Sequence, residues 1–170
     1  MIAGLVLTFD TRHSKFDIRM SHPRTTGREL ALQYLYMHDV LQGKDVYPFS
    51  DYAGHQQPPP DQASVLFARE LVDAVVQHKE ELDKDIAEVA TNWNIDRMAA
   101  VDRNILRVGL AELTIHPDTS FKIVLNEAVE LAKRYSSEEA GAFVNGLLDK
   151  LRTKLRPETA AQAAEPTIGS

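Results

Sequence analysis

Cysteine is absent from this sequence of 170 residues. Without a thiol the chain has no disulfide, no thiolate zinc site, no iron–sulfur cluster and no cysteine nucleophile, and a reducing compartment is the expected location. Long hydrophobic runs are also missing. The longest run, from Ile2 to Phe9, is too short to cross a bilayer and lacks the flanks of a signal peptide. We therefore expect a soluble, cytoplasmic protein without a membrane partner.

Sequence signatures of catalysis are missing as well. No two of the six histidines are three or four residues apart, so no helical pair of metal ligands exists. The chain has no glycine-rich phosphate loop, no dinucleotide-binding glycine motif and no serine nucleophile elbow. Glu127 and Glu130 share a helix face, but pairing of Glu130 with Arg134 explains them better than a pair of catalytic acids. We expect no enzyme activity, no metal and no cofactor.

The pattern of apolar residues predicts an all-α fold. With 44% hydrophobic and 26% charged residues, the composition is that of an ordinary globular chain. After residue 20 the apolar positions recur at helical spacing, and no alternating run bounded by turn residues indicates a strand. About seven helices are predicted. The acidic residues between Glu80 and Glu88 are interpreted as the hydrated surface of one of them.

Capping and breaking residues predict where helices begin and end. Thr26 with Glu29, and Ser136 with Glu139, have the spacing of a capping box, so a helix is expected to begin at each pair. Residues 43–63 contain Pro48, Gly54 and three consecutive prolines, which predicts a long flexible loop.

The two ends of the chain are set apart by their composition. Residues 1–22 are interpreted as a disordered N-terminal extension, and Met20 is an alternative start of the protein. Residues 157–170, rich in Ala, Gln, Glu and Pro, are interpreted as a disordered tail. The helical domain is therefore expected to span residues 23–156.

The net charge of −6 argues at first against a nucleic-acid partner, but the charge is segregated. Residues 11–28 carry five basic side chains and one acid, and residues 150–156 carry four basic side chains and no acid. The stretch 29–149 holds 21 acids and 10 bases. A polyanion can therefore meet a basic arm on an otherwise acidic protein.

Two aromatic residues near basic segments are candidates for stacking on RNA bases. Tyr34 lies on the apolar stripe of its helix whereas Tyr36 does not, so Tyr36 is either an exposed ring or a rim residue packed on a neighbouring loop. Phe143 is ambiguous in the same way, with core packing as the default. Bases of single-stranded RNA stack on rings of this kind.

Four ordered blocks of sequence resemble the NusB family of bacterial transcription antitermination factors. They are Arg28 to Tyr36 (RELALQYLY), Phe67 to Leu71 (FAREL), Val101 to Arg107 (VDRNILR), and Asn126 to Lys133 (NEAVELAK) followed by Phe143 to Gly146 (FVNG). The resemblance covers residues 24–156. It implies an all-helical fold of two small packed bundles and a role without catalysis. It further implies pairing with NusE, a small-subunit ribosomal protein, and binding of the boxA element of ribosomal RNA transcripts within the antitermination complex of RNA polymerase.

The resemblance also assigns residues by position. The residues that it places on the RNA side are Arg24, Arg28, Gln33, Tyr36, Lys122, Glu139 and Phe143. Asp102 and Arg107 match the region that faces the ribosomal protein. Formation of a homodimer when that partner is absent is left open.

This sequence departs from the family pattern within the arginine-rich block. Thr25, Thr26 and Gly27 occupy positions at which other members carry further arginines. Each lost phosphate contact weakens electrostatic binding, so we expect modest RNA affinity without the partner unless Arg12, Lys15 and Arg19 compensate.

Two alternatives remain at this point. One is the NusB-like, non-catalytic domain attached to ribosomal RNA cytosine methyltransferases, but the 14 residues after Arg156 are too few for a catalytic domain. The other is a protein-interaction module that has lost its RNA role together with its arginines.

Overall fold

The protein is all-helical in the computed structural model, which describes residues 22–44, 46–91 and 94–155. These residues form seven α-helices and one 3-10 helix, with no strand among them, which confirms the predicted fold class. Apart from His22, the predicted extension over 1–22 lies outside the described residues, as does the predicted tail over 157–170. Arg12, Lys15 and Arg19 also lie outside them.

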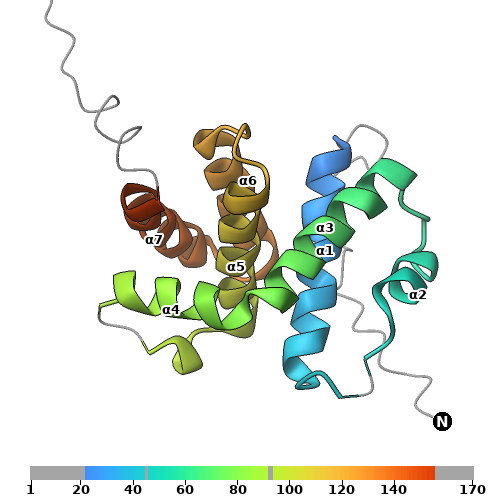
Figure 1. Ribbon diagram of the computed structural model, residues 1–170, viewed down its shortest axis with the longest axis horizontal. Coiled ribbons are helices and arrows are strands. Elements are labelled where there is room, and N and C mark those ends of the chain that lie inside the picture. The colour runs from blue at the N-terminus through green and yellow to red at the C-terminus, as the bar shows by residue number, and fades with distance from the viewer. Residues whose placement is uncertain (1–21, 45, 92–93, 156–170) are drawn as a thin grey trace, which may run out of the picture. The chain divides into compact units, whose positions relative to one another are not determined.

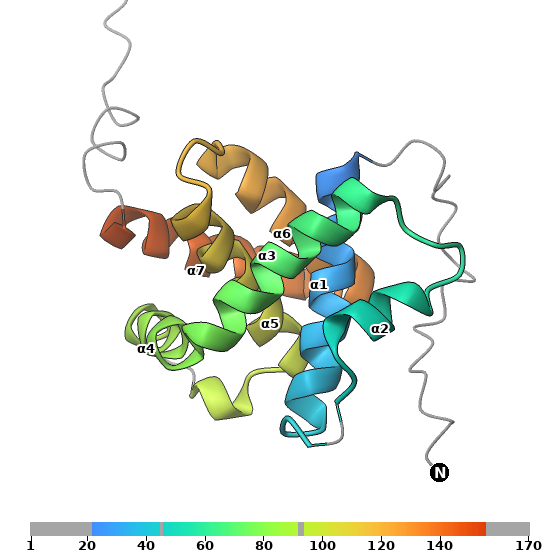
Figure 2. The same cartoon turned by 45° about the vertical axis from the view of Figure 1, so that its right-hand side comes forward.

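The chain divides into two compact units, with the boundary between Asp73 and Ala74. The first unit contains α1 (Pro23–Val40), α2 (Phe49–Gly54) and most of α3 (Gln62–Gln77). Both views of the ribbon place α1 and α3 side by side (Figures 1 and 2). The apolar stripe of α1 is buried, as its helical spacing predicts, and Tyr34 belongs to it.

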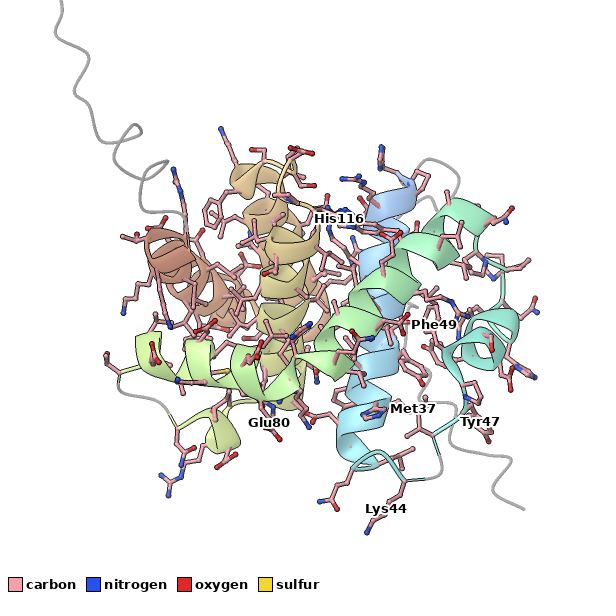
Figure 3. All side chains as sticks on the ribbon, viewed as in Figure 1. Met37, Lys44, Tyr47, Phe49, Glu80 and His116 are labelled. Carbon is pink, nitrogen blue, oxygen red and sulfur yellow. The ribbon has the colours of Figure 1, made fainter. Side chains whose placement is uncertain are left out.

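Tyr34 joins α1 to the segment that precedes α2. Its hydroxyl donates a hydrogen bond of 2.8 Å to the carbonyl oxygen of Tyr47, and its ring contacts that of Phe49 edge to face, with centroids 5.3 Å apart. Figure 3 shows Phe49 on the side of α2 toward α1, whereas Tyr47 lies below α2, away from α1. Burial, and to a smaller extent the charge of Asp73, raises the pKa of Tyr34.

The prediction of a flexible loop over residues 43–63 is wrong, because α2 lies within it. Pro48 occupies the N-cap position, where a missing N–H costs nothing. Phe49 and Ala53, four residues apart, are both buried. Two buried residues on one face therefore hold a short helix between the prolines, although they are too few to produce a visible period in the sequence.

Both predicted capping boxes are displaced. The first helix begins at Pro23, because His22 caps it and proline at the first position already has the backbone angle of a helix. Thr26 is therefore inside the helix. At the second box the N–H of Ala140 donates to the hydroxyl of Ser137, one residue after the predicted Ser136, whose backbone instead ends the preceding helix.

The second unit contains α4 (Lys79–Val89), the 3-10 helix η3 (Ile95–Arg97), α5 (Ala100–Ile115), α6 (Phe121–Tyr135) and α7 (Glu138–Leu155). In the helix α5 eleven of the sixteen residues are buried. A Cβ built at Gly109 would lie in ordinary van der Waals contact with Leu148 of α7 and Val124 of α6, so both helices pack on α5 (Figure 1).

Ion pairs connect α4 to the rest of this unit, which corrects its interpretation as hydrated surface. Arg107 of α5 is only 3% exposed and donates two hydrogen bonds, of 2.6 and 2.7 Å, to the carboxylate of Asp83. Lys154 of α7 donates to Asp85 and Glu88. These contacts hold the pKa of Lys154 above its ordinary value. The acids of α4 are thus partly counter-charges for bases from other helices.

We predict that Asp83→Ala destabilises the protein much more than Asp85→Ala does. The first change leaves the buried guanidinium of Arg107 without its carboxylate, at a cost of about 3 kcal/mol in the free energy of unfolding. The second removes a solvent-exposed pair that water screens, so its effect is far smaller. Urea unfolding of the two variants, which alter the same helix, measures both values. Equal losses would contradict this ranking.

Candidate nucleic-acid interface

The first two turns of α1 hold the arginines expected to meet RNA, and Arg24 lies in the first of them. His22 caps this turn, since the N–H of Arg24 donates to its Nδ1 at 3.3 Å. With the helix starting at Pro23, Arg24 and Arg28 are four residues apart and lie on the same face. Their side chains differ sharply in exposure: Arg24 is exposed, whereas Arg28 is 3% exposed.

Both arginines contact one aromatic ring of α3. The guanidinium carbon of Arg24 lies 5.2 Å from the ring centroid of Phe67, and that of Arg28 lies 5.4 Å from it. These distances are those of cation–π interactions. The FAREL block that contains Phe67 was recognised in the sequence, but Phe67 was not assigned to the site. The sequence gives no signal for it, because the contact joins residues about forty positions apart.

Gly27 is one position of this arm at which an arginine does not fit. A Cβ at this position would lie 2.8 Å from Cδ1 of Phe67 and 2.9 Å from the backbone oxygen of Ser64. Real side chains do not come so close to a backbone atom. The helices α1 and α3 therefore approach each other through Gly27, and neither arginine nor any other residue with a Cβ fits there without moving α3.

Gln33 and Tyr36 follow on α1, and both are partly exposed. The amide oxygen of Gln33 accepts a hydrogen bond of 3.2 Å from the hydroxyl of Tyr52 in α2, which orients the amide. Tyr36 is partly accessible whereas Tyr34 is buried, as the stripe on α1 predicts.

The second unit holds the other predicted RNA-side residues. Lys122 is exposed in the first turn of α6. Glu139 is exposed in the first turn of α7, where hydrogen bonds from its own backbone N–H and from the Ser137 hydroxyl lower the pKa of its carboxyl. Phe143, one turn further along α7, is partly exposed, so its ring is neither fully in the core nor fully in solvent.

The two residues predicted to face a protein partner are both buried. Asp102 is 9% exposed; the hydroxyl of Ser136 donates a hydrogen bond to its carboxyl, and burial raises the pKa of this group. Its Oδ1 has no hydrogen-bond partner among the described residues. Arg107 is occupied by Asp83 and by the amide oxygen of Asn104. Through its contact with Asp83, Arg107 therefore holds α4 against α5 independently of any partner.

Two of the four bases in residues 150–156, at the end of α7, are engaged within their own unit. Lys154 binds two acids of α4, and the guanidinium of Arg152 lies 5.0 Å from the ring centroid of Phe121. Arg156 lies outside the described residues. The sequence alone predicts that these charges are available to a polyanion, but Arg152 and Lys154 make contacts within their own unit.

The predicted RNA-side residues thus fall into two groups. Arg24, Arg28, Gln33 and Tyr36 belong to the first unit, whereas Lys122, Glu139 and Phe143 belong to the second. Within the first unit the structure brings the two arginines together on Phe67.

In the described part of the chain no helix is both long and apolar enough to cross a membrane, and no three His, Asp or Glu side chains are grouped as metal ligands.

Comparison with known proteins gives consistent matches. The model of the NusB family matches residues 25–153. The transcription antitermination protein NusB of Myxococcus xanthus is 43% identical over 134 residues, covering 78% of this chain and 96% of its own length. That of Anaeromyxobacter dehalogenans is 45% identical over 139 residues, covering 81% of this chain and 96% of its own.

Solved structures agree with the sequence relatives. NusB of T. maritima has a TM-score of 0.73 at 27% identity, covering 84% of this chain and 99% of that one. A crystal structure of the antitermination factors NusB and NusE in complex with double-stranded RNA has a TM-score of 0.69 at 31% identity, covering 79% of this chain and 99% of that one.

We predict that Gly27→Ala lowers the free energy of unfolding by about 1–3 kcal/mol, because the new methyl group overlaps the backbone of α3. Gly146→Ala is the matched control, since a Cβ there meets no atom within 4 Å. Alanine also favours a helix over glycine, so this control gains stability slightly. Chemical unfolding compares the two variants, and a Gly27→Ala variant as stable as the parent would disprove the close approach.

Proposed function

This chain belongs to the NusB family, and we propose that it is an RNA-binding transcription antitermination factor that pairs with the ribosomal protein NusE. The finer part of the proposal is that the pair binds the boxA element of ribosomal RNA transcripts and so supports read-through of terminators. Family membership confirms the resemblance seen in the sequence. The relatives are named for antitermination and not for a catalysed reaction, which agrees with a role that is not enzymatic.

One observation carries the RNA-binding role: an exposed arginine is fixed at the start of α1. The guanidinium of Arg24 lies over a buried ring in a residue that is exposed to solvent, so we assign to it the contact with a phosphate oxygen. Guanidinium groups bind phosphate with two parallel hydrogen bonds, and a fixed group loses less rotational freedom on binding. Buried Arg28 serves mainly to anchor this turn.

Base recognition is assigned to rings and polar groups that are partly exposed. Tyr36 and Phe143 each present part of a ring, on which an unstacked base can lie. The amide of Gln33 is held by Tyr52 and so offers hydrogen bonds in a set direction. Lys122 adds positive charge, whereas the ionised carboxyl of Glu139 repels phosphate and limits affinity.

NusE is proposed to complete the binding surface. The solved complex of NusB and NusE with double-stranded RNA supports this pairing. Arg107 and Asp102 are buried, so we assign them to supporting the partner-facing surface, with Arg107 fixing α4 through Asp83. Because α1 presents a single exposed arginine and each phosphate contact adds to affinity, the partner's contribution is proposed to be large.

The proposal is tested by titrating labelled boxA RNA with the full chain, alone and mixed with the cognate NusE. We expect the mixture to bind more tightly than the chain alone and more tightly than it binds a shuffled RNA of equal length. In the mixture, Arg24→Ala should weaken binding about tenfold, the value for one charged hydrogen-bonded contact. Arg97→Ala, which removes an exposed arginine from η3, is the control and should leave the affinity unchanged.

Two results would count against the proposal. Equal binding of boxA and shuffled RNA by the mixture would remove boxA recognition. Formation of the protein pair without any RNA binding would identify the chain as a protein-interaction module. Measuring single-stranded and duplex forms of the same element shows which form is bound.

A further inference from the structure

Phe67 has an unusual environment for a core residue, because two guanidinium groups contact its ring. Arg24 and Arg28 come from successive turns of α1, and Phe67 comes from α3. The ring is 7% exposed, so it offers no surface on which a nucleotide base can stack. Any effect of Phe67 on RNA binding must therefore pass through the arginines.

Both arginines contact the ring of Phe67, but only one of them is exposed to solvent. Arg28 is buried, whereas Arg24 is exposed and holds its guanidinium 5.2 Å from the ring centroid. A free arginine side chain samples many rotamers, and binding that fixes one of them loses this freedom. A guanidinium that is already held on a ring has lost part of its rotational freedom before the ligand binds, and this favours tighter binding.

The backbone enforces this arrangement. Gly27 lies between the two arginines in sequence and brings α1 against Phe67 and the backbone of Ser64. The distance from the helix to the ring is therefore set by backbone contact and not by the long side chains themselves. The ring of Phe67 therefore lies beside the point on α1 from which the side chain of Arg24 extends.

We propose that Phe67 is a positioning residue for RNA binding, holding the guanidinium of Arg24 in the orientation that meets phosphate. This inference rests on the proposed function. It explains how an arm with few arginines still presents a defined phosphate contact. Phe67 itself does not touch the RNA.

A double-mutant cycle on the full chain, mixed with NusE and titrated with boxA RNA, tests this role. We expect Phe67→Leu, which keeps an apolar side chain but removes the ring, to weaken binding about threefold to tenfold. Combined with Arg24→Ala it should weaken binding no more than Arg24→Ala alone, because the ring acts only through that arginine. Phe67→Tyr, which keeps a ring, should restore most of the affinity.

Phe49→Leu is the matched control. Phe49 is also buried, at 6% exposure, and lies under another arginine, with the guanidinium of Arg69 5.6 Å from its centroid. Its loss removes the same kind of stack from the same unit. We expect its effect on RNA affinity to stay within twofold and to add independently to that of Arg24→Ala. Thermal unfolding confirms that each variant is folded, and Phe67→Met replaces Phe67→Leu if leucine prevents folding.

The outcomes separate this inference from the proposed function. If Arg24→Ala weakens binding and the loss from Phe67→Leu adds fully to it, Phe67 is a structural residue only and the inference is overturned. If Arg24→Ala has no effect while the pair still binds boxA RNA, the phosphate contact of Arg24 is wrong and Phe67 has nothing to position. Loss of boxA binding by the parent protein overturns the proposed function itself.

Discussion

The close approach of α1 to α3 at Gly27 is the constraint on which the proposed RNA-binding arm, residues 24–28, depends. Because no Cβ separates the helices, the ring of Phe67 lies directly against the first two turns of α1. Two arginines then share that ring, one buried and one exposed. Gly27 thus excludes a larger side chain at its own position and brings α1 close to the ring that both arginines contact.

The distribution of charge gives the net value of −6 a more specific meaning. Most bases that sequence counting assigned to the two ends of the chain prove, where described, to have a role in the fold. Arg28 is buried on Phe67, Arg152 lies over Phe121, and Lys154 neutralises two acids of α4. In the proposed function, binding of a polyanion therefore depends on a few exposed cations and on the partner, and not on a broad basic surface.

Helical periodicity was sufficient to predict the fold class and the burial of Tyr34, because a repeat of 3.6 residues over several turns reports one buried face. It failed at α2, since a six-residue helix has too few turns to show a period. The helix caps differ from those predicted. His22 with Pro23 begins α1 in place of the Thr26–Glu29 pair, and Ser137 caps α7 in place of Ser136.

The candidate site could be predicted only in part, since its members were assigned by position within the region that resembles the family. Contacts between distant segments of the chain place Phe67 in the site and bury Arg28, Asp102 and Arg107. Local spacing in the sequence does not encode such contacts. Likewise, nothing in the sequence around Asp83 distinguishes it from the exposed acids beside it. Its role follows from Arg107, 24 residues further along the chain.

The most direct test of the account is the state of Arg24 before any RNA is present. An NMR spectrum of the free, full-length protein reports it through nuclear Overhauser effects between the Arg24 side chain and the Phe67 ring. We expect such effects, together with ring-current shifts of the Arg24 Hδ protons that disappear in Phe67→Leu. Arg24 protons at random-coil shifts, with no Overhauser effect to Phe67, would contradict a pre-positioned arginine.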